Sequence, residues 1–316
     1  MDAPVNVRRG VAVDPAAAPR RRPRTRAKFF ELLFLLPAVI FVIVTVLYPL
    51  GYNIGLSFFK VGIREVVSGG AQWIGLDNYI SEFSQPAFWN ALGISVFYTA
   101  FVVLIAVALG MLLALFFNLE FRGRSQMRAL ILIAWVLPSV VSANIWRWLF
   151  DGSYGLLNAG LGALGFIKGP IFWLSNADSA RIAVVLASVW SLAPFAMILL
   201  IAGLQSVSKT LYEAARIDGA SRWQQFWYVT MPILRPVTLT TALLCFIYTF
   251  RVFDVIFLMT QGGPGNATKV LTVYAYQEAF SFYHFGTAGV ATTVLLIVPI
   301  VLALFYFRSV RKEERS

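Results

Sequence analysis

The stretch SQPAFWNALGISVFYTAFVVLIAVALGMLLALFFNL, from Ser84 to Leu119, contains no Asp, Glu, Lys or Arg. A helix needs about 20 predominantly apolar residues to cross the hydrocarbon core of a bilayer. The stretch exceeds this length, so it predicts a membrane-spanning helix.

Comparable apolar segments lie on both sides of this stretch. Four are uncharged, and a fifth is interrupted only by Arg251 and Asp254. Together with Ser84 to Leu119 they predict an all-α, polytopic membrane protein with six transmembrane helices. The segments are Leu32 to Phe59, Ala129 to Trp146, Ile182 to Ser208, Pro236 to Asn266 and Gly286 to Phe307.

The composition excludes a soluble domain of this length. Apolar residues make up 59% of the 316 residues, whereas charged residues make up 13%. A soluble protein needs more polar side chains than this to cover its surface.

The positions of the basic residues predict the orientation. If the N-terminus is cytoplasmic, 19 of the 26 Lys and Arg residues lie in the tails and loops of the cytoplasmic side. This positive-inside bias places both termini in the cytoplasm. It also accounts for the net charge of +11 without nucleic-acid binding, because the charge adjoins spans that contact anionic lipid.

Two residue types set limits on the chemistry. Cys245 is the only cysteine and His284 the only histidine, so neither a disulfide framework nor a metal site built from these side chains is expected. His284 is interpreted as a loop histidine.

The chain divides into three parts. Residues 1–28 are basic and rich in Pro and Ala, which predicts a disordered cytoplasmic tail. Residues 29–310 form the transmembrane domain, and residues 311–316 form a cytoplasmic C-terminal tail. Several aromatic residues are interpreted as an interfacial belt, and one pair of charges, Arg147 and Asp151, as an exposed ion pair; the aromatics are Trp135, Trp146, Trp148, Trp173 and Tyr154.

The cytoplasmic loop at residues 205–235 is the longest on that side. Glu213 to Ala215 favour a helix, Gly219 ends it, and Ala220 to Tyr228 can form a second helix before Pro232. This pattern predicts a helix-turn-helix at the membrane surface. A plain amphipathic anchor is the alternative that pattern alone leaves open.

The same loop resembles the Glu-Ala-Ala signature of bacterial ABC importer permeases. Glu213, Ala214 and Ala215 match, and Gly219 and Pro232 follow at the family's spacing. Val229 and Met231 are conservative departures from Ile and Leu.

Further stretches resemble the carbohydrate-uptake branch of this family. They are Trp73 to Tyr79, Pro86 to Leu92, Gly155 to Asn158, Ala202 to Gln205 and Thr260 to Pro264 followed by Thr268. The last of these is similar to the first of two permeases, the larger maltose-type membrane subunit.

The resemblance implies a type I ABC importer permease in the bacterial cytoplasmic membrane. Such a permease is a non-enzymatic channel subunit, and its solute would be a sugar, a sugar phosphate or a polyol phosphate. It implies a second permease, an ATPase dimer that holds ATP and Mg, and an extracytoplasmic binding protein or lipoprotein as partners, with no cofactor in this chain. It also implies that the loop couples to the ATPase through a set of residues: Glu213, Ala214, Ala215, Asp218 and Gly219.

The substrate path is expected on two spans. On the fifth, four residues recur at i, i+3, i+4 and i+7 and share a helix face; they are Cys245, Tyr248, Thr249 and Val252. The resemblance carries sugar-contacting positions onto these four and onto Ser191, Leu192 and Phe195 of the fourth span.

An intramembrane pair follows on the same span. Arg251 and Asp254 lie at i and i+3, where they can neutralise each other. The pair is interpreted as a lock of the bundle or of a subunit interface, with substrate contact as the alternative.

Two other classes of protein are weighed against this interpretation. An integral-membrane enzyme needs clustered carboxylates or histidines at one membrane face, but the acids here are scattered. A simple channel or scaffold leaves the Glu-Ala-Ala loop without a purpose.

Overall fold

The computed structural model describes residues 34–313, with the side chains of 309–313 outside the description. The basic tail predicted at residues 1–28 therefore lies outside the described residues. The chain divides into two compact units at Tyr52 and Asn53, inside the first helix.

The described elements are almost entirely helical. In chain order they are η1 (Ile43–Leu47), α2 (Tyr48–Leu56), β1 (Phe59–Lys60), α3 (Ile63–Ser68), β2 (Gln72–Trp73), α4 (Asp77–Phe83), α5 (Pro86–Asn118), α6 (Arg124–Val136), α7 (Ser139–Leu149), α8 (Leu156–Ala163), α9 (Ala177–Gln205), α10 (Lys209–Ile217), α11 (Arg222–Gln225), η2 (Phe226–Thr230), α12 (Met231–Phe250), α13 (Asp254–Thr260), α14 (Leu271–Tyr276), η3 (Gln277–Ser281) and α15 (Phe285–Glu313). The β1 and β2 strands form a two-stranded antiparallel ribbon that pairs Phe59 with Trp73.

Five helices among the described residues are long and apolar enough to cross a membrane, and a bent helix pair brings the number to six. The five are Phe34–Leu56, Pro86–Asn118, Ala177–Gln205, Arg222–Phe250 and Phe285–Arg308. The prediction of an all-α polytopic protein is confirmed, with five candidate spans, or six if the bent pair is one span.

The third span differs from the straight helix that its apolar run predicts. It is the bent pair, in which α6 and α7 meet at 95°. Pro138 lacks an N–H and holds the preceding residue, Leu137, in an extended conformation (ψ 136°), so the helix cannot continue through this point.

The apolar run from Pro236 to Asn266 is also broken. The helix α12 ends at Phe250, and the short helix α13 begins at Asp254. The hydroxyl of Thr272 donates to the carbonyl oxygen of Val252 at 2.6 Å and so satisfies a backbone acceptor that the break leaves outside a helix.

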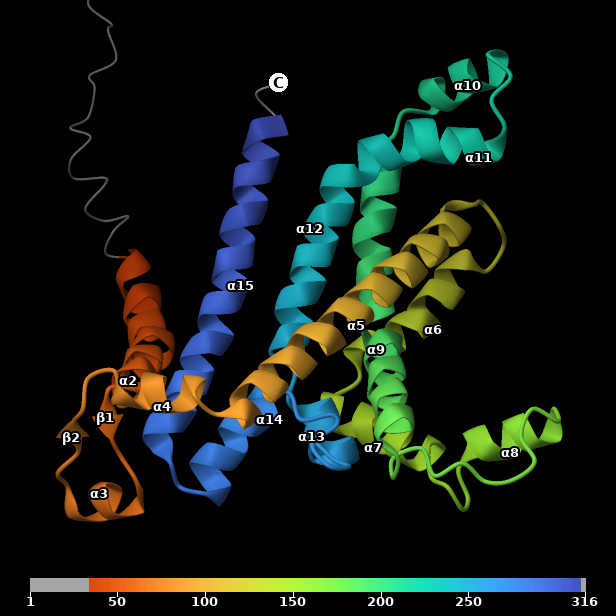
Figure 1. Ribbon diagram of the computed structural model, residues 1–316. Helices are drawn as coiled ribbons and strands as arrows, with labels where there is room; N and C mark the ends of the chain where they lie inside the picture. Colours follow the sequence, from red (N-terminus) through yellow and green to blue (C-terminus); the bar gives the residue numbers. More distant parts are fainter. Residues whose placement is uncertain (1–33, 314–316) are drawn as a thin grey trace, which may run out of the picture. The chain divides into compact units, whose positions relative to one another are not determined.

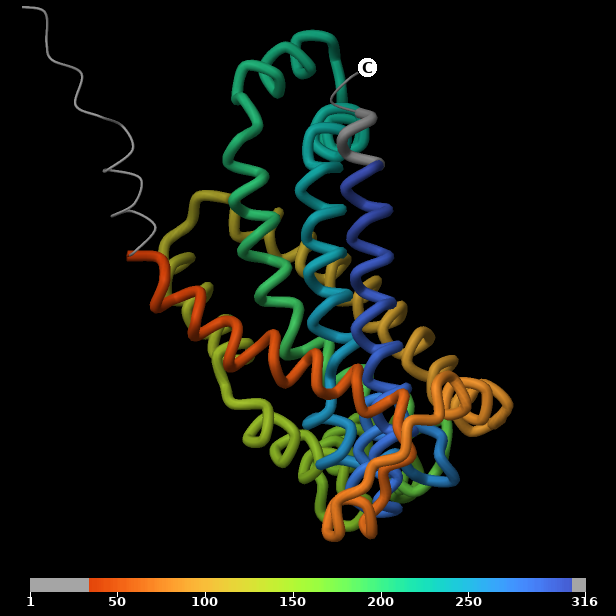
Figure 2. Tube along the Cα trace, turned by 90° about the vertical axis from the view of Figure 1, so that its left-hand side faces the viewer, coloured from red at the N-terminus to blue at the C-terminus, as the bar shows by residue number. Residues whose placement is uncertain are grey.

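Within the second unit, α9, α12 and α15 run alongside one another and α5 crosses them (Figures 1 and 2). The backbones of α5 and α9 approach each other closely because Gly110 lacks a side chain. A Cβ atom there would lie 2.7 Å from Ala196 Cβ and 3.0 Å from Met197 N. Small residues at such crossings are typical of helices packed in membranes.

The loops of this unit lie at its two ends. The helices α10 and α11 lie at the same end as the C-terminal end of α15, whereas α3, α8 and α13 lie at the other (Figure 1). We refer to these as the coupling end and the opposite end.

Candidate functional site

The loop between α9 and α12 folds as the helix-turn-helix that its sequence predicts. Ser208 caps α10, because its hydroxyl accepts from the N–H of Thr210 at 3.3 Å. Ser221 caps α11 in a capping box with Gln224.

Gly219 makes the turn between these helices. Its φ of +79° lies in the left-handed region, where a glycine avoids the cost that a Cβ brings. Two N–H groups return to the end of α10: Gly219 donates to Arg216 O at 3.1 Å, and Ala220 donates to Ala215 O at 2.9 Å. This pairing is a Schellman motif, which satisfies carbonyl groups that a helix end leaves free.

The loop is tied to the body of the protein at its base. The Tyr212 and Thr230 hydroxyls lie 2.9 Å apart and join α10 to η2, and Gln225 donates to the carbonyl of Ala220 at 2.9 Å. The helix-turn-helix is therefore a positioned element of the chain.

Its outward surface combines charge with uncovered apolar side chains. Glu213, Ala214, Asp218 and Gly219 are exposed, and Ala215 is half-buried. Ile217 is 87% exposed and Trp223 is 69% exposed. Sequence reasoning missed these last two; for Ile217 the signal was an apolar residue directly before the helix-ending Asp218 and Gly219.

A second candidate region lies where α6, α9 and α12 meet. The ring of Phe195 stacks on Trp135 at 5.3 Å and meets Tyr248 edge-on at 5.5 Å. Tyr248 is 60% exposed, so this aromatic face, formed by Trp135, Phe195 and Tyr248, is open on one side.

Polar groups extend from this face towards the kink after Pro138. The Ser191 and Ser142 hydroxyls lie 3.2 Å apart and join α9 to α7. The Ser139 hydroxyl donates to the carboxylate of Asp254 and joins α7 to α13.

Of the predicted path residues, the structure brings Phe195 and Tyr248 together, with Ser191 one turn before Phe195 on α9. Leu192 is half-buried and packs against the core at the opposite end. Cys245 and Thr249 are buried inside the bundle, and Val252 lies beyond the end of α12. Cys245, Tyr248 and Thr249 lie on α12 as predicted, whereas Val252 does not share their helix face, because α12 ends at Phe250. That these residues contact a solute stays a prediction.

The predicted pair of Arg251 and Asp254 does not form. Asp254 bonds to Ser139, while the guanidinium of Arg251 makes neither a hydrogen bond nor an ion pair with the described side chains and backbone. The i, i+3 spacing aligns side chains only on a continuous helix, and the break at residues 251–253 removes that condition.

Of two further interpretations from sequence, one changes. Trp135 stacks on Phe195, and its place in an interfacial belt stays a prediction. The Asp151 carboxylate accepts from the N–H groups of Ser153 and Tyr154 at 2.8 and 3.1 Å, and no ion pair with Arg147 is present among the described residues. These two hydrogen bonds lower the pKa of Asp151.

A cluster of titratable groups lies at the opposite end. Tyr274 donates to both carboxylate oxygens of Glu82 at 2.8 and 3.0 Å, and His284 Nδ1 lies 3.0 Å from the carboxylate of Glu278. Glu82 is buried, and this desolvation raises the pKa of its carboxyl. The hydrogen bond holds the loop helix α4 against α14.

Comparison with known proteins identifies the family. Residues 106–313 match the family described as binding-protein-dependent transport system inner membrane component. The Escherichia coli K12 inner membrane ABC transporter permease protein YcjO is 35% identical over 87% of this chain and 92% of the relative.

Other relatives carry names that mention a solute. The Thermococcus litoralis trehalose/maltose transport system permease protein MalF is 34% identical over 86% of this chain and 90% of its own length. The Agrobacterium fabrum sulfoquinovosyl glycerol transport system permease protein SmoG is 32% identical over 91% of this chain and 92% of its own length.

The fold is also found in a solved structure. A chain of a bacterial ABC transporter involved in the import of alginate superposes with a TM-score of 0.76 at 22% identity, over 91% of this chain and 96% of that chain. The protein is thus a non-catalytic, multi-pass subunit of the cytoplasmic membrane, and the chain belongs to the family of inner membrane components of binding-protein-dependent ABC transport systems.

Proposed function

We propose that this chain is one of two permease subunits of an ATP-driven importer for a carbohydrate, with both termini in the cytoplasm. The observation that carries the proposal is the exposed helix-turn-helix of α10 and α11 at the coupling end. A positioned loop that leaves Ile217 87% exposed to water is typical of a surface that another protein covers. The partner we propose is an ATPase dimer, which holds ATP and Mg.

The coupling residues are proposed from their places on this loop. Glu213, Ala214 and Ala215 lie on α10, and Asp218 and Gly219 form its end. Ile217 is the apolar anchor of the interface, since a few buried apolar side chains commonly dominate binding energy while charges set orientation.

The carbohydrate substrate is proposed from the aromatic face. Trp135, Phe195 and Tyr248 offer ring surfaces to the apolar face of a sugar, and the Tyr248 hydroxyl can exchange hydrogen bonds with sugar hydroxyls. The relatives named for trehalose, maltose and sulfoquinovosyl glycerol support this class of solute.

The second permease is proposed because the aromatic face is open. Binding sites bury most of a ligand's surface. The aromatic face covers a solute on one side only, so a second subunit is needed to cover the other side. The extracytoplasmic binding protein supplies the solute at the opposite end, which fits the family.

The test is co-purification with the ATPase subunits of the same transport system. Ile217→Asp and Glu213→Lys are expected to lower the recovered ATPase, because they place a charge in the apolar contact and reverse a charge beside it. Glu120→Lys is the matched control, an exposed carboxylate that follows α5 outside the helix-turn-helix. Equal ATPase recovery in all three variants would overturn the assignment of this loop.

A further inference from the structure

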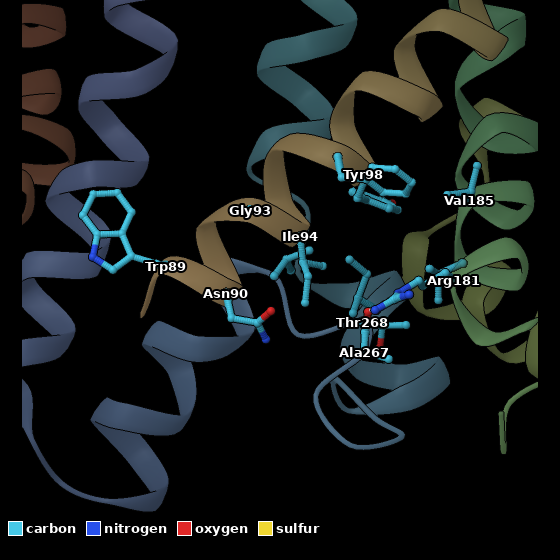
Figure 3. Close-up of a pocket in the computed structure, with 13 residues that line it drawn as sticks. Trp89, Asn90, Gly93, Ile94, Tyr98, Arg181, Val185, Ala267 and Thr268 are labelled. Atoms are coloured by element: carbon cyan, nitrogen blue, oxygen red, sulfur yellow. The ribbon is translucent and has the colours of Figure 1, made fainter. Parts of the chain in front are cut away.

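A cavity of about 370 Å³ lies between the first turns of α5 and α9 at the opposite end. Figure 3 shows Trp89, Asn90 and Gly93 of α5 on one side and Arg181 of α9 with Ala267 and Thr268 on the other. Its inner wall is formed by Tyr98, Val184 and Ile256, which are buried in the core. The cavity belongs to neither the helix-turn-helix nor the aromatic face.

The cavity follows the first turns of α5 towards the middle of the helix. The 33 residues of α5 extend about 50 Å, which exceeds the about 30 Å hydrocarbon core, so a membrane-spanning α5 has the length to place its first turns at headgroup level. Asn90 and Arg181 are each the fifth residue of their helix. Phe97 and Tyr98 lie about two turns deeper, at the level of acyl chains.

The chemistry of the lining changes along the same direction. Arg181 and Asn90 stand at the shallow end, and Ile94, Phe97 and Val185 line the deeper part. Phe97 is 53% exposed, so the deeper part of the cavity is open at the surface of this chain.

Arg181 keeps hydrogen-bonding capacity for a ligand. A guanidinium has five N–H donors. Within the described residues Arg181 uses Nε on Ala267 O at 3.0 Å and Nη1 on the Asp178 carboxylate at 3.3 Å. The Asp178 side chain is 87% exposed, and an exposed i, i+3 ion pair holds its cation weakly.

We infer that this cavity binds one phospholipid, with the phosphodiester on Arg181 and Asn90 and an acyl chain along Ile94 and Phe97. The Nε bond to Ala267 fixes the guanidinium plane, and its remaining donors suit phosphate oxygens, which Arg binds in a fork. The lipid belongs to the leaflet at the opposite end. The bond to Ala267 also links the lipid site to the loop between α13 and α14.

A phospholipid fits better than the other two classes of ligand. Sugar hydroxyls would need polar partners in the deeper part, where Ile94, Phe97 and Val185 offer none and the Tyr98 hydroxyl is bonded to Ser188, and a free anion would leave that part empty. A protein partner remains an outcome of the test below.

The test is native mass spectrometry of the full-length protein in detergent, titrated with phosphatidylglycerol. Arg181→Gln removes the cation, and Gly93→Leu fills the cavity. Gly93 is suited to this change because a Cβ there meets nothing within 4 Å, so the variant is expected to fold. Each variant is expected to retain phosphatidylglycerol about tenfold more weakly than the wild type, the effect of losing a charge-assisted bond or the space for a chain.

Two matched controls isolate the site. Arg147→Gln removes another exposed cation, in the last turn of α7, and Gly55→Leu changes another helical glycine with open space around it. Both are expected to bind phosphatidylglycerol as the wild type does. Diacylglycerol, which lacks the phosphate, is expected to bind wild type and Arg181→Gln equally.

Three results would overturn the inference. One is equal phosphatidylglycerol retention by all four variants. Another is competition by millimolar inorganic phosphate, which would indicate an anion site without a lipid. The third is loss of the bound phosphatidylglycerol when the importer complex assembles, which would show that a protein partner covers this face.

Discussion

At the scale of single residues, Tyr248 shows how the same amino acid can serve packing or transport. Its ring meets Phe195, yet 60% of the side chain is exposed. Cys245, about one turn before it, and Thr249, the next residue, are buried. From Thr241 to Phe250 the other residues of α12 are buried or half-buried, so Tyr248 is the exposed side chain of this segment and the one proposed to contact a solute.

Tyr248→Ala is therefore expected to reduce solute uptake while leaving assembly and basal ATPase activity unchanged. Tyr248→Phe keeps the ring and loses one neutral hydrogen bond, worth about 0.5–1.5 kcal/mol, so about a twofold to tenfold loss is expected. Uptake into proteoliposomes measures both. Loss of assembly in Tyr248→Ala would instead make Tyr248 a packing residue.

Glu82 gives a prediction about pH. Burial raises the pKa of its carboxyl above the ordinary value of 4.5, so the folded protein holds this proton after the unfolded chain has lost it. The free energy of unfolding should therefore fall as pH rises from 4.5 through the folded-state pKa. Glu82→Gln should lose this part of the pH dependence, because an amide does not titrate.

Thermal unfolding of the purified protein at several pH values measures the difference between wild type and Glu82→Gln. The comparison cancels the titration of Glu278 and His284, which both proteins share. An identical slope in the two proteins would mean that the pKa of Glu82 is the same in the folded and the unfolded states.

At the scale of elements, Gly219 determines whether α10 and α11 form a hairpin. Gly219→Pro fixes φ near −65° where the turn needs +79° and removes the N–H that bonds to Arg216 O. The variant should insert into the membrane but hydrolyse ATP without solute uptake. Gly165→Pro is the control, since Gly165 has a φ of +75° in a loop at the opposite end. If Gly219→Pro keeps normal solute-stimulated ATPase activity, the coupling role is contradicted.

The crossing of α5 and α9 offers a matched pair on one helix. Gly110→Ala forces a Cβ to within 2.7 Å of Ala196 Cβ, so a loss of about 1–3 kcal/mol in stability is expected. Gly93→Ala has open space and should gain up to about 1 kcal/mol from helix propensity. Thermal unfolding in detergent ranks the two; equal midpoints would show that the helices shift to accept the methyl group.

The elements also show which features sequence alone predicts. Span number and the helix-turn-helix follow from local properties, namely apolar run length and the glycine and serine positions around α10 and α11. The break before Asp254 involves a bond between distant segments, from Thr272 to Val252, whereas the 95° bend follows from Pro138 inside an apolar run. Hydropathy reports transfer into lipid and carries no signal for such bonds, so the pair of Arg251 and Asp254 and the face ending at Val252 were predicted on a helix that is not continuous.

At the scale of the whole molecule, the distribution of charge predicts orientation. The cations of the coupling end include Arg122, Arg124, Lys209, Arg216 and Arg222. Cytoplasmic loops retain Lys and Arg because translocating them is costly. The coupling end should therefore face the cytoplasm, where ATP is available to the proposed ATPase.

Reporter fusions test this orientation along the chain. Fusions at Gly70, Arg124, Gly165, Ala220 and Val270 should report outside, inside, outside, inside and outside in turn. The decisive fusion is Gly165, because it follows the bent pair of α6 and α7, the one span that is not a single long helix. If this pair re-enters the membrane without crossing it, Gly165 reports inside, and the orientation of every later loop reverses. An outside signal at Gly165 with an inside signal at Ala220 requires the bent pair to cross as one span, and it places the helix-turn-helix on the side where an ATPase can reach Ile217.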